Sequence, residues 1–343
     1  MRNLLILLTI IIFAYSCKTT KNKICNQSFL VVNYNVENLF DTIDDPYKFD
    51  ESFIPQGKKH WTSKRYEDKL QKLAYVIQQI DAEKMPDVVG LVEIENQTVL
   101  EDLIAQKELT RADYKIVHHE GPDARGIDCA MLYKPSSFEV IKSTFYRVDM
   151  ANNPRFKTRE ILYVKGKVKA AKDEVHIFVN HWPSRRGGEE KSAPKRALAA
   201  SVLRHAVDSI LATDAMAKII IIGDFNDETD NKSITQVLGA STDSDAVLYN
   251  TSAKEDAQQL GSYHYWKTKK WNMLDQMIIS KGLRNATDGI MATNLEMHIF
   301  KPQWLLHKDK DGAESPSKTY GKGYYGGYSD HLPIYQYFEF DCH

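Results

Sequence analysis

The chain has 343 residues, of which 45 are Lys or Arg and 46 are Asp or Glu, so its formal net charge is −1. This near-neutral balance excludes a surface that is strongly basic overall, so any binding site for nucleic acid or another polyanion has to be a local basic patch. No Pro/Gly/Ser-rich linker and no repeat divides the sequence, so we expect one large α/β domain.

The N-terminus has the pattern of an export signal. Arg2 supplies one positive charge, the run 4–14 is largely apolar, and Cys17 follows Tyr15-Ser16. An apolar run of this length is typical of a secretory signal and is too short for a permanent membrane-spanning helix. Residues 14–17 also resemble the bacterial lipobox, in which the cysteine is lipidated and becomes the mature N-terminus.

We therefore predict an exported protein, either a lipoprotein anchored to a membrane through Cys17 or a secreted protein in which Cys17 is incidental. The predicted divisions are a signal peptide at 1–16, a polar, Lys-rich tether at 17–27 and a single folded domain at 28–343.

Along this domain, apolar runs that indicate β-strands outnumber the amphipathic helices. Strands are expected at 29–32, 88–92, 114–118, 128–133, 138–147, 161–168, 175–179, 218–222, 274–279 and 334–340. Helices are expected from Ser63 through an apolar stripe that ends at Ile80, near 98–106, and at about 194–212. This order predicts two β-sheets packed face to face, with helices on their outer surfaces. The stretch 299–328 is expected to be a long surface loop beside the functional site.

Three cysteines follow Cys17. Cys129 lies in an apolar run and is expected to be a buried thiol. Cys25 precedes the first strand and Cys342 follows the last, so the two would meet if these strands are antiparallel neighbours. Because an exported protein can oxidise such a pair, we hypothesise a Cys25–Cys342 disulfide.

Six short polar clusters follow or end the apolar runs. They are Asn35–Asn38, Glu93–Glu95, Asn180–Arg185, Gly223–Asp227, Leu274–Gln276 and Ser329–Pro333. Carboxylate and amide oxygens suit a hard cation such as Mg²⁺, and imidazoles can move protons beside it. Polar groups of this kind at strand ends are what a metal-assisted phosphoester hydrolase needs and what a packed core does not.

Two of these clusters indicate catalytic chemistry most directly. After Gly223, Asp224 and Asn226 lie on one side of a strand end and can share a phosphate or its attacking water. The alternative is that they cap an Asx-type turn. At the other cluster, Asp330 can bind the cation while His331 faces the substrate phosphate or the path of the proton.

Taken in order, the six clusters resemble those of the endonuclease/exonuclease/phosphatase superfamily, which includes DNase I, abasic-site endonucleases, neutral sphingomyelinases and inositol polyphosphate 5-phosphatases. The resemblance covers residues 29–340. The segments 180–188 and 126–133 are similar to a secreted, nuclease-like bacterial branch. The fold that this resemblance implies is the four-layered α/β sandwich of DNase I, with two packed, mainly antiparallel β-sheets flanked by helices, and it makes 28–343 the catalytic domain.

The resemblance also implies a metal site for Mg²⁺ or Mn²⁺. Asn35, Glu93 and Asp330 match the residues that hold the cation. Glu95 is the alternative to Glu93, but the strand before Glu93 matches the family's second strand, so Glu95 is expected to support the site or the turn. Glu37 is expected to reach the cation through water.

The implied catalytic residues lie on other strand ends. His181 matches the histidine that contacts the scissile phosphate, while Asp224 and Asn226 match the acid and amide that position water or the leaving oxygen. Asp275 matches the acid that fixes the tautomer of His331. The division of acid and base roles stays open.

Arg185 and Arg125 are expected to bind the substrate phosphate, because guanidinium groups match phosphate oxygens. The alternative is that they anchor loops. The nine-residue segment that contains Arg185 also belongs to the part that resembles the nuclease-like branch.

We therefore expect an exported, metal-dependent phosphodiesterase that binds nucleic acid and hydrolyses DNA or RNA as a monomer. The runner-up is a phospholipid or sphingomyelin phosphodiesterase, or an inositol-phosphate phosphatase, of the same superfamily. A remote alternative is a non-catalytic surface lipoprotein on an enzyme fold.

Overall fold

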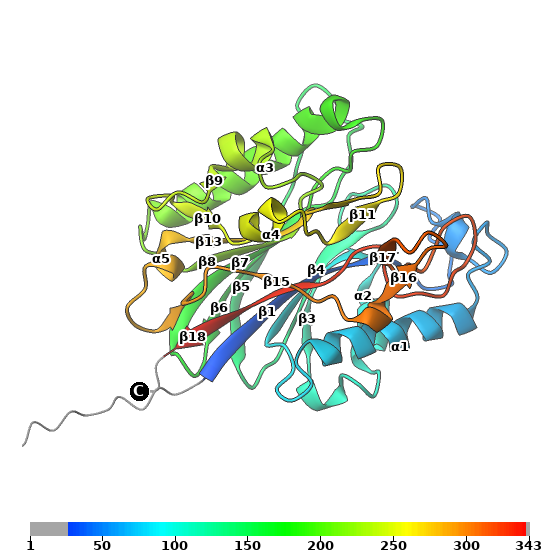
Figure 1. Ribbon diagram of the computed structural model, residues 1–343, viewed down its shortest axis with the longest axis horizontal. Helices are drawn as coiled ribbons and strands as arrows, with labels where there is room; N and C mark the ends of the chain where they lie inside the picture. The colour runs from blue at the N-terminus through cyan, green and yellow to red at the C-terminus, as the bar shows by residue number, and fades with distance from the viewer. Residues whose placement is uncertain (1–26, 341–343) are drawn as a thin grey trace, which may run out of the picture.

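The computed structural model describes residues 27–340. The predicted signal peptide, Cys17, the tether up to residue 26 and the hypothesised Cys25–Cys342 disulfide lie outside these residues. Two large sheets pack face to face, with α1 and α2 on the outside of one sheet and α3 on the outside of the other (Figure 1). The predicted four-layered α/β sandwich is confirmed.

The first sheet has seven strands. They are β14 (Ile290–Met291), β18 (Ile334–Phe340), β1 (Gln27–Leu39), β2 (Val88–Ile94), β4 (Asp128–Tyr133) and β3 (Lys115–Val117) in spatial order, with β15 (His298–Ile299) also paired to β18. Only the β1–β2 pair is parallel in this sheet. Its outer face is covered by α1 (Ser63–Ile80) and α2 (Gln97–Ile104).

The second sheet also has seven strands. Their order is β5 (Phe138–Tyr146), β6 (Ile161–Val168), β7 (Asp173–His181), β8 (Ile219–Asp224), β13 (Asp275–Ser280), β10 (Leu248–Asn250) and β9 (Ala240–Ser241). The pairs β7–β8 and β9–β10 are parallel, and the others are antiparallel. Helix α3 (Glu189–Leu211) and a six-residue π-helix, η3 (Ser233–Leu238), pack on its outer face.

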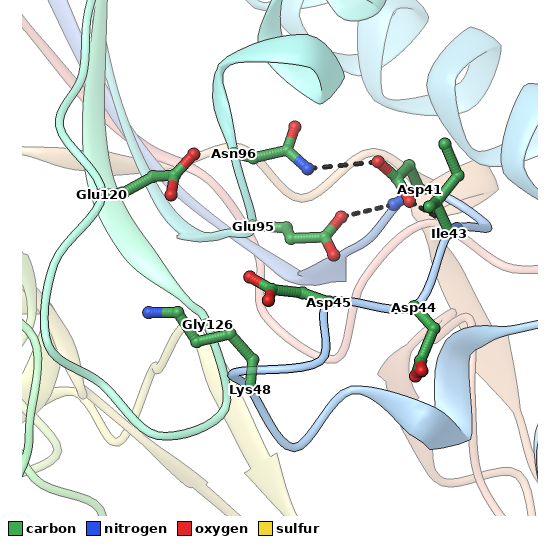
Figure 2. Close-up of a pocket in the computed structure, with 9 residues that line it drawn as sticks. All are labelled: Asp41, Ile43, Asp44, Asp45, Lys48, Glu95, Asn96, Glu120 and Gly126. Carbon is green, nitrogen blue, oxygen red and sulfur yellow. Dashed lines mark hydrogen bonds between the residues drawn. The ribbon is translucent and has the colours of Figure 1, made fainter.

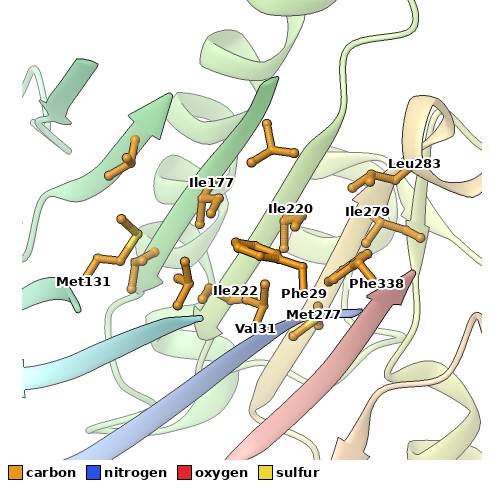
Figure 3. Close-up of a cluster of buried hydrophobic side chains, with 14 of the residues drawn as sticks. Phe29, Val31, Met131, Ile177, Ile220, Ile222, Met277, Ile279, Leu283 and Phe338 are labelled. Atoms are coloured by element: carbon orange, nitrogen blue, oxygen red, sulfur yellow. The ribbon is translucent and has the colours of Figure 1, made fainter. Parts of the chain in front are cut away.

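Strand periodicity divides the core into three layers. In β1, Phe29 and Val31 face the space between the sheets, whereas Leu30 and Val32 face α1. In β8, Ile220 and Ile222 point into the same inter-sheet core, which Figure 3 shows, while Ile219 and Ile221 face α3. A strand buried on both faces needs an unbroken apolar run, and that is what the sequence provides.

Strand register gathers the polar clusters at one end of the sandwich. His181 pairs with Asp224 across the parallel β7–β8 pair, and Asp275 pairs with Asp224 across β13–β8. In the first sheet, Asn33 pairs with Ile334, so the residues just before β18 lie beside the residues that follow Asn33 in β1. The fold therefore brings side chains almost 300 residues apart to a common rim.

Two predictions of local structure are wrong. Helix α3 begins at Glu189 rather than near Pro194. Pro194 therefore lies inside the helix, where its missing N–H removes one backbone hydrogen bond. The stretch 299–328 is not a plain loop. It contains a 3₁₀ turn at Gln303–Leu305 and a hairpin of β16 (Leu306–Lys308) and β17 (Glu314–Pro316).

The remaining elements are short. They are the 3₁₀ turns η1 (Glu51–Phe53) and η2 (Thr110–Ala112), the helices α4 (Ala253–Ala257) and α5 (Lys281–Arg284), and a hairpin of β11 (Tyr263–Tyr265) and β12 (Lys270–Asn272). Within residues 27–340, none of the helices has the length and apolar character to cross a membrane.

Candidate active site

Asp224, the last residue of β8, occupies the centre of the rim. Its Oδ2 atom lies 3.7 Å from Nε2 of His181 and 3.9 Å from Nε2 of His331. The amide nitrogen of Asn35 donates a 3.0 Å hydrogen bond to the same oxygen. One carboxylate therefore faces an imidazole at the end of β7, an amide within β1 and an imidazole from the loop before β18.

The local backbone explains how Asp224 reaches this position. Gly223 has φ +148°, and a Cβ atom there would lie 2.1 Å from the carbonyl oxygen of Asn180, so only glycine fits. The backbone N–H of Asn226 donates a 2.9 Å bond to Oδ1 of Asp224. The Asx-type turn considered from the sequence is thus present, and it leaves Oδ2 directed at the site.

His331 is held by a buried carboxylate. Its Nδ1 lies 2.6 Å from Oδ2 of Asp275, which also accepts a 2.6 Å bond from the hydroxyl of Ser262. Burial alone would lower the pKa of His331, but the charges of Asp275 and Asp224 outweigh it and raise this pKa well above its ordinary value. Asp275 therefore orients the ring, so that Nε2 faces Asp224.

The pKa values of Asp224 and His181 are shifted in opposite directions. Burial raises the pKa of Asp224 to about 7, against the lowering effect of His331. Burial, followed by the charges of Arg159 and Arg125, lowers the pKa of His181 well below its ordinary value, so its imidazole is neutral. Such divergent shifts within one cluster are typical of catalytic groups.

The predicted metal ligands lie on the first-sheet side of the rim. Glu93 has a left-handed backbone, with φ +70°, and its Oε2 accepts a 2.8 Å bond from the N–H of Asn38. Its Oε1 lies 3.8 Å from Nε2 of His181. Burial raises the pKa of Glu93, and the next largest cause is the negative charge of Asp330. These two acids are therefore near neighbours with like charges.

A divalent cation fits this donor set. Among residues 27–340, no three His, Cys, Asp or Glu side chains form a metal-binding group by themselves. The predicted set instead has two carboxylates, Glu93 and Asp330, and the amide of Asn35. An ion held by so few protein oxygens completes its shell with water and substrate, as Mg²⁺ usually does. It would also relieve the repulsion between the two acids.

Glu37 is fixed by a distant segment. Its carboxylate accepts bonds of 2.6 Å and 3.1 Å from the backbone N–H groups of Thr319 and Tyr320. Burial and the charge of Asp330 raise the pKa of Glu37 to about 8, while Lys69 opposes the shift. Glu37 thus belongs to the acidic side of the rim, together with the predicted metal ligands.

Lys69 is the main feature of the site that the sequence prediction missed. This fully buried side chain of α1 donates bonds of 2.7 Å to the hydroxyl of Thr319 and 3.2 Å to the carbonyl oxygen of Tyr328. Burial lowers the pKa of Lys69, and Glu37 and Asp330 counteract this shift. A signal was available, because Lys69 lies four positions before Leu73 and so falls on the apolar stripe of the helix.

The two predicted phosphate-binding arginines have different surroundings. Nε of Arg185 donates a 2.8 Å bond to the carbonyl oxygen of Asn226, and its Nη1 pairs with Glu189 at 3.2 Å. These are the contacts of a loop anchor, the alternative role considered from the sequence. Arg125 is more exposed, and its nearest acid is Asp123 at 3.5 Å. The phosphate-binding roles of both residues stay predictions.

Glu95 lies in a separate acidic pocket, shown in Figure 2. Its Oε2 accepts a 2.7 Å bond from the N–H of Asp41, and burial raises the pKa of Glu95 to about 8. The pocket is lined by Asp41, Ile43, Asp44, Asp45, Lys48, Glu95, Asn96, Glu120 and Gly126. Glu93 and Glu95 are only two residues apart in the sequence, but Glu93 lies at the rim and Glu95 lies in the acidic pocket.

Comparison with known proteins identifies the class. Residues 30–340 match the Endonuclease/Exonuclease/phosphatase family, and the chain belongs to this family, whose members hydrolyse phosphoesters. No curated protein matches the sequence significantly.

Several solved structures share the fold. Mannosyl-6-phosphatase Bt3783 of Bacteroides thetaiotaomicron is 15% identical, with a TM-score of 0.56 over 90% of this chain and 99% of that one. TDP2 of D. rerio, solved with a single-strand DNA product, is 16% identical, with a TM-score of 0.55 over 92% and 100%. The human Nocturnin catalytic domain, solved with sulfate, is 17% identical, with a TM-score of 0.53 over 91% and 94%. At these identities the likeness is one of fold.

Proposed function

We propose that this protein is an Mg²⁺- or Mn²⁺-dependent phosphodiesterase whose substrates are DNA or RNA. The observation that supports this proposal is the gathering of His181, His331 and Asn35 around the carboxylate of Asp224, all within 4 Å. Nothing in the packing of a core requires two imidazoles and an amide around one buried acid.

In this proposal Asn35, Glu93 and Asp330 would hold the cation, whose charge would stabilise a phosphate oxygen. The raised pKa of Asp224, about 7, suits it to accept a proton from water near neutral pH. His331, kept protonated by Asp275, can donate to the leaving oxygen. Neutral His181 can donate an N–H to the phosphate, in the manner of other preorganised donors.

A small phosphoester is the second candidate substrate. The near-neutral net charge and the acidic pocket around Glu95 disfavour a long polyanion on that side of the rim. This candidate includes the phospholipid, sphingomyelin and inositol-phosphate substrates expected from the sequence. Mannosyl-6-phosphatase and TDP2, which share the fold, show that phosphatases and DNA-binding proteins are both built on it.

A substrate panel distinguishes these candidates. Plasmid DNA, RNA, sphingomyelin, inositol phosphates and mannose 6-phosphate are incubated with the enzyme and Mg²⁺, with Mn²⁺, or with EDTA. Cleavage of DNA or RNA that EDTA abolishes supports the proposal. Turnover restricted to one of the small phosphoesters selects the second candidate. If His331→Ala retains the wild-type rate, the activity does not come from this site.

We also propose that the protein is exported and anchored through a lipid on Cys17. The support is the sequence of residues 1–17 alone. Wild type should fractionate with membranes, and Cys17→Ala should be released or left unprocessed. Wild type that remains in the soluble fraction would contradict the anchor.

A further inference from the structure

An aromatic cluster borders the acidic side of the rim. Phe40 and Phe53 stack with their ring centroids 4.1 Å apart, and Tyr320 meets both Phe53 and Trp61 edge to face at 5.5 Å and 5.2 Å. Trp61 is fully buried, and its indole N–H donates to the carbonyl oxygen of Phe40. Since the backbone N–H of Tyr320 binds Glu37, this cluster is directly attached to the site.

Lys59 lies over this cluster. Its ammonium is 4.3 Å from the ring centroid of Tyr320 and 5.2 Å from that of Phe53, which are cation–π distances. Within residues 27–340, no carboxylate lies within 4 Å of this ammonium, and it donates no hydrogen bond. Lys69 and Arg159, by contrast, are bonded to protein oxygens. The N–H donors of Lys59 are therefore available to a ligand.

The segment that carries Lys59 is rigidly built. The N–H of Lys59 donates to the carbonyl oxygen of Ser52 at 3.1 Å, and its own carbonyl oxygen accepts a 2.6 Å bond from Arg65. Gly57 permits this close path, because a Cβ atom there would lie 2.1 Å from the carbonyl oxygen of Glu51. A cation fixed in advance loses little entropy when it binds an anion.

Lys59 is connected to the acidic side of the rim through Tyr320, whose ring its ammonium covers and whose backbone N–H binds Glu37. It is only half-buried, and burial lowers its pKa while the charges of Glu37 and Asp330 raise it. Both acids belong to the side of the rim that holds the predicted metal ligands. The ammonium therefore lies over Tyr320, the neighbour of Glu37, on the side of the rim where we expect the phosphate to bind.

We propose that Lys59 binds a second phosphate group of the substrate, next to the phosphate that is hydrolysed. This inference rests on the proposed function and specifies its substrate as a compound with at least two phosphates. The acidic pocket around Glu95 is unsuited to such a group, so the second phosphate is directed toward the aromatic cluster. Lys59 then determines specificity rather than the chemical step.

Binding of mononucleotides tests the inference without turnover. Thymidine 3′,5′-bisphosphate contains one phosphate more than thymidine 5′-phosphate or thymidine 3′-phosphate, and isothermal titration in Mg²⁺ gives the three dissociation constants. Wild type should prefer the bisphosphate over at least one monophosphate by about tenfold or more, the usual contribution of a charged hydrogen bond. Lys59→Met should lose this preference and Lys59→Arg should largely keep it.

Lys58→Met is the matched control, because Lys58 is the exposed neighbour and has no contact with the aromatic cluster. It should keep the wild-type preference. The inference is wrong if wild type shows no preference, if Lys59→Met keeps it, or if Lys58→Met loses it equally. A merely structural role of Lys59 would lower the melting temperature and weaken all three ligands alike.

Kinetics then separate this inference from the proposed function. The ratio of kcat/KM for a terminally phosphorylated dinucleotide to that for the unphosphorylated dinucleotide should fall about tenfold in Lys59→Met. If wild type hydrolyses neither dinucleotide but binds the bisphosphate through Lys59, the nuclease function fails and the phosphate-binding site stands. If wild type hydrolyses both dinucleotides and Lys59→Met leaves the ratio of their kcat/KM values unchanged, the nuclease function stands and the phosphate-binding role of Lys59 is wrong.

Discussion

The two sides of the rim are built by different means. On the second-sheet side, His181, Asp224 and Asp275 are neighbours because their strands pair in register. On the first-sheet side, Glu37 and Glu93 have unusual backbone conformations, and Glu37 is also held by a segment some 280 residues further along the chain. Regular pairing positions His181, Asp224 and Asp275, whereas irregular structure positions Glu37 and Glu93.

Backbone strain supports this contrast. Among residues 27–340, ten non-glycine residues have positive φ, and four of them lie at the rim. Glu37, Asn38 and Glu93 belong to the first-sheet side, and only Asn226 to the other. Such conformations cost free energy and persist where the surroundings enforce them, often at functional sites. The acidic side should therefore be less tolerant of changes in its supports.

The largest expected effect is at His331, which precedes β18 of the first sheet and is held by Asp275 of the second. His331→Ala should lower kcat by about 10²–10⁴-fold, the usual contribution of a general acid or base. Asp275→Asn should have a smaller effect of the same kind, because His331 is still present but its tautomer is no longer fixed. Steady-state kinetics on the best substrate of the panel measure both. Thermal unfolding should be little changed in His331→Ala, and a wild-type rate in this variant would contradict its role.

Glu93 and Glu95 provide a matched pair for the first-sheet side. Glu93→Gln should raise the Mg²⁺ concentration for half-maximal activity and lower kcat at saturation by about 10²-fold, because a ligand charge is lost. Glu95→Gln should change neither by more than about twofold, since Glu95 lies in the separate acidic pocket. Metal titrations at fixed substrate make the measurement. Equal effects of the two substitutions would mean that the metal site is misassigned.

These variants also show what the sequence could and could not predict. Asp224 ends one apolar run, whereas Asp275 and His331 stand at or before the start of two others, and strand pairing brings Asp224 and Asp275 together. The partners of Glu37 could not be predicted in this way, because the backbone N–H groups of Thr319 and Tyr320 leave no residue-type signal. Pro194 suggested a helix start that lies five residues too late, because proline was taken as a boundary.

Lys69 tests whether the acidic side depends on its distant support. Lys69→Met removes the two hydrogen bonds that connect α1 to Thr319 and Tyr328, and should lower the free energy of unfolding by about 2–3 kcal/mol. It should also weaken Mg²⁺ activation, because Thr319 holds Glu37. Urea unfolding and metal titration check the two effects.

Lys64→Met is the control on the same helix. Lys64 is exposed, so its loss should cost less than about 1 kcal/mol. If Lys69→Met is as stable as Lys64→Met and is activated normally by Mg²⁺, the first-sheet side does not depend on this buried cation.

The smallest effect concerns stability alone and lies at the opposite end of β7, the strand that ends in His181. Burial and, after it, the charge of Lys165 lower the pKa of His176, whose Nδ1 is 2.8 Å from the hydroxyl of Tyr163. The folded state therefore favours the neutral ring. As the pH falls below the ordinary value of about 6.5, the unfolded chain takes up a proton that the folded chain resists, so stability is lost.

His176→Gln should remove this part of the pH dependence. Urea unfolding at pH 7.5 and pH 5 should show a smaller loss of stability in the variant than in wild type, while kcat at pH 7.5 stays the same. The comparison between the two proteins is needed because Glu37 and Asp224, whose pKa values are raised, act in the opposite direction. A changed kcat would mean that the two ends of β7 are coupled, and that register alone does not position His181.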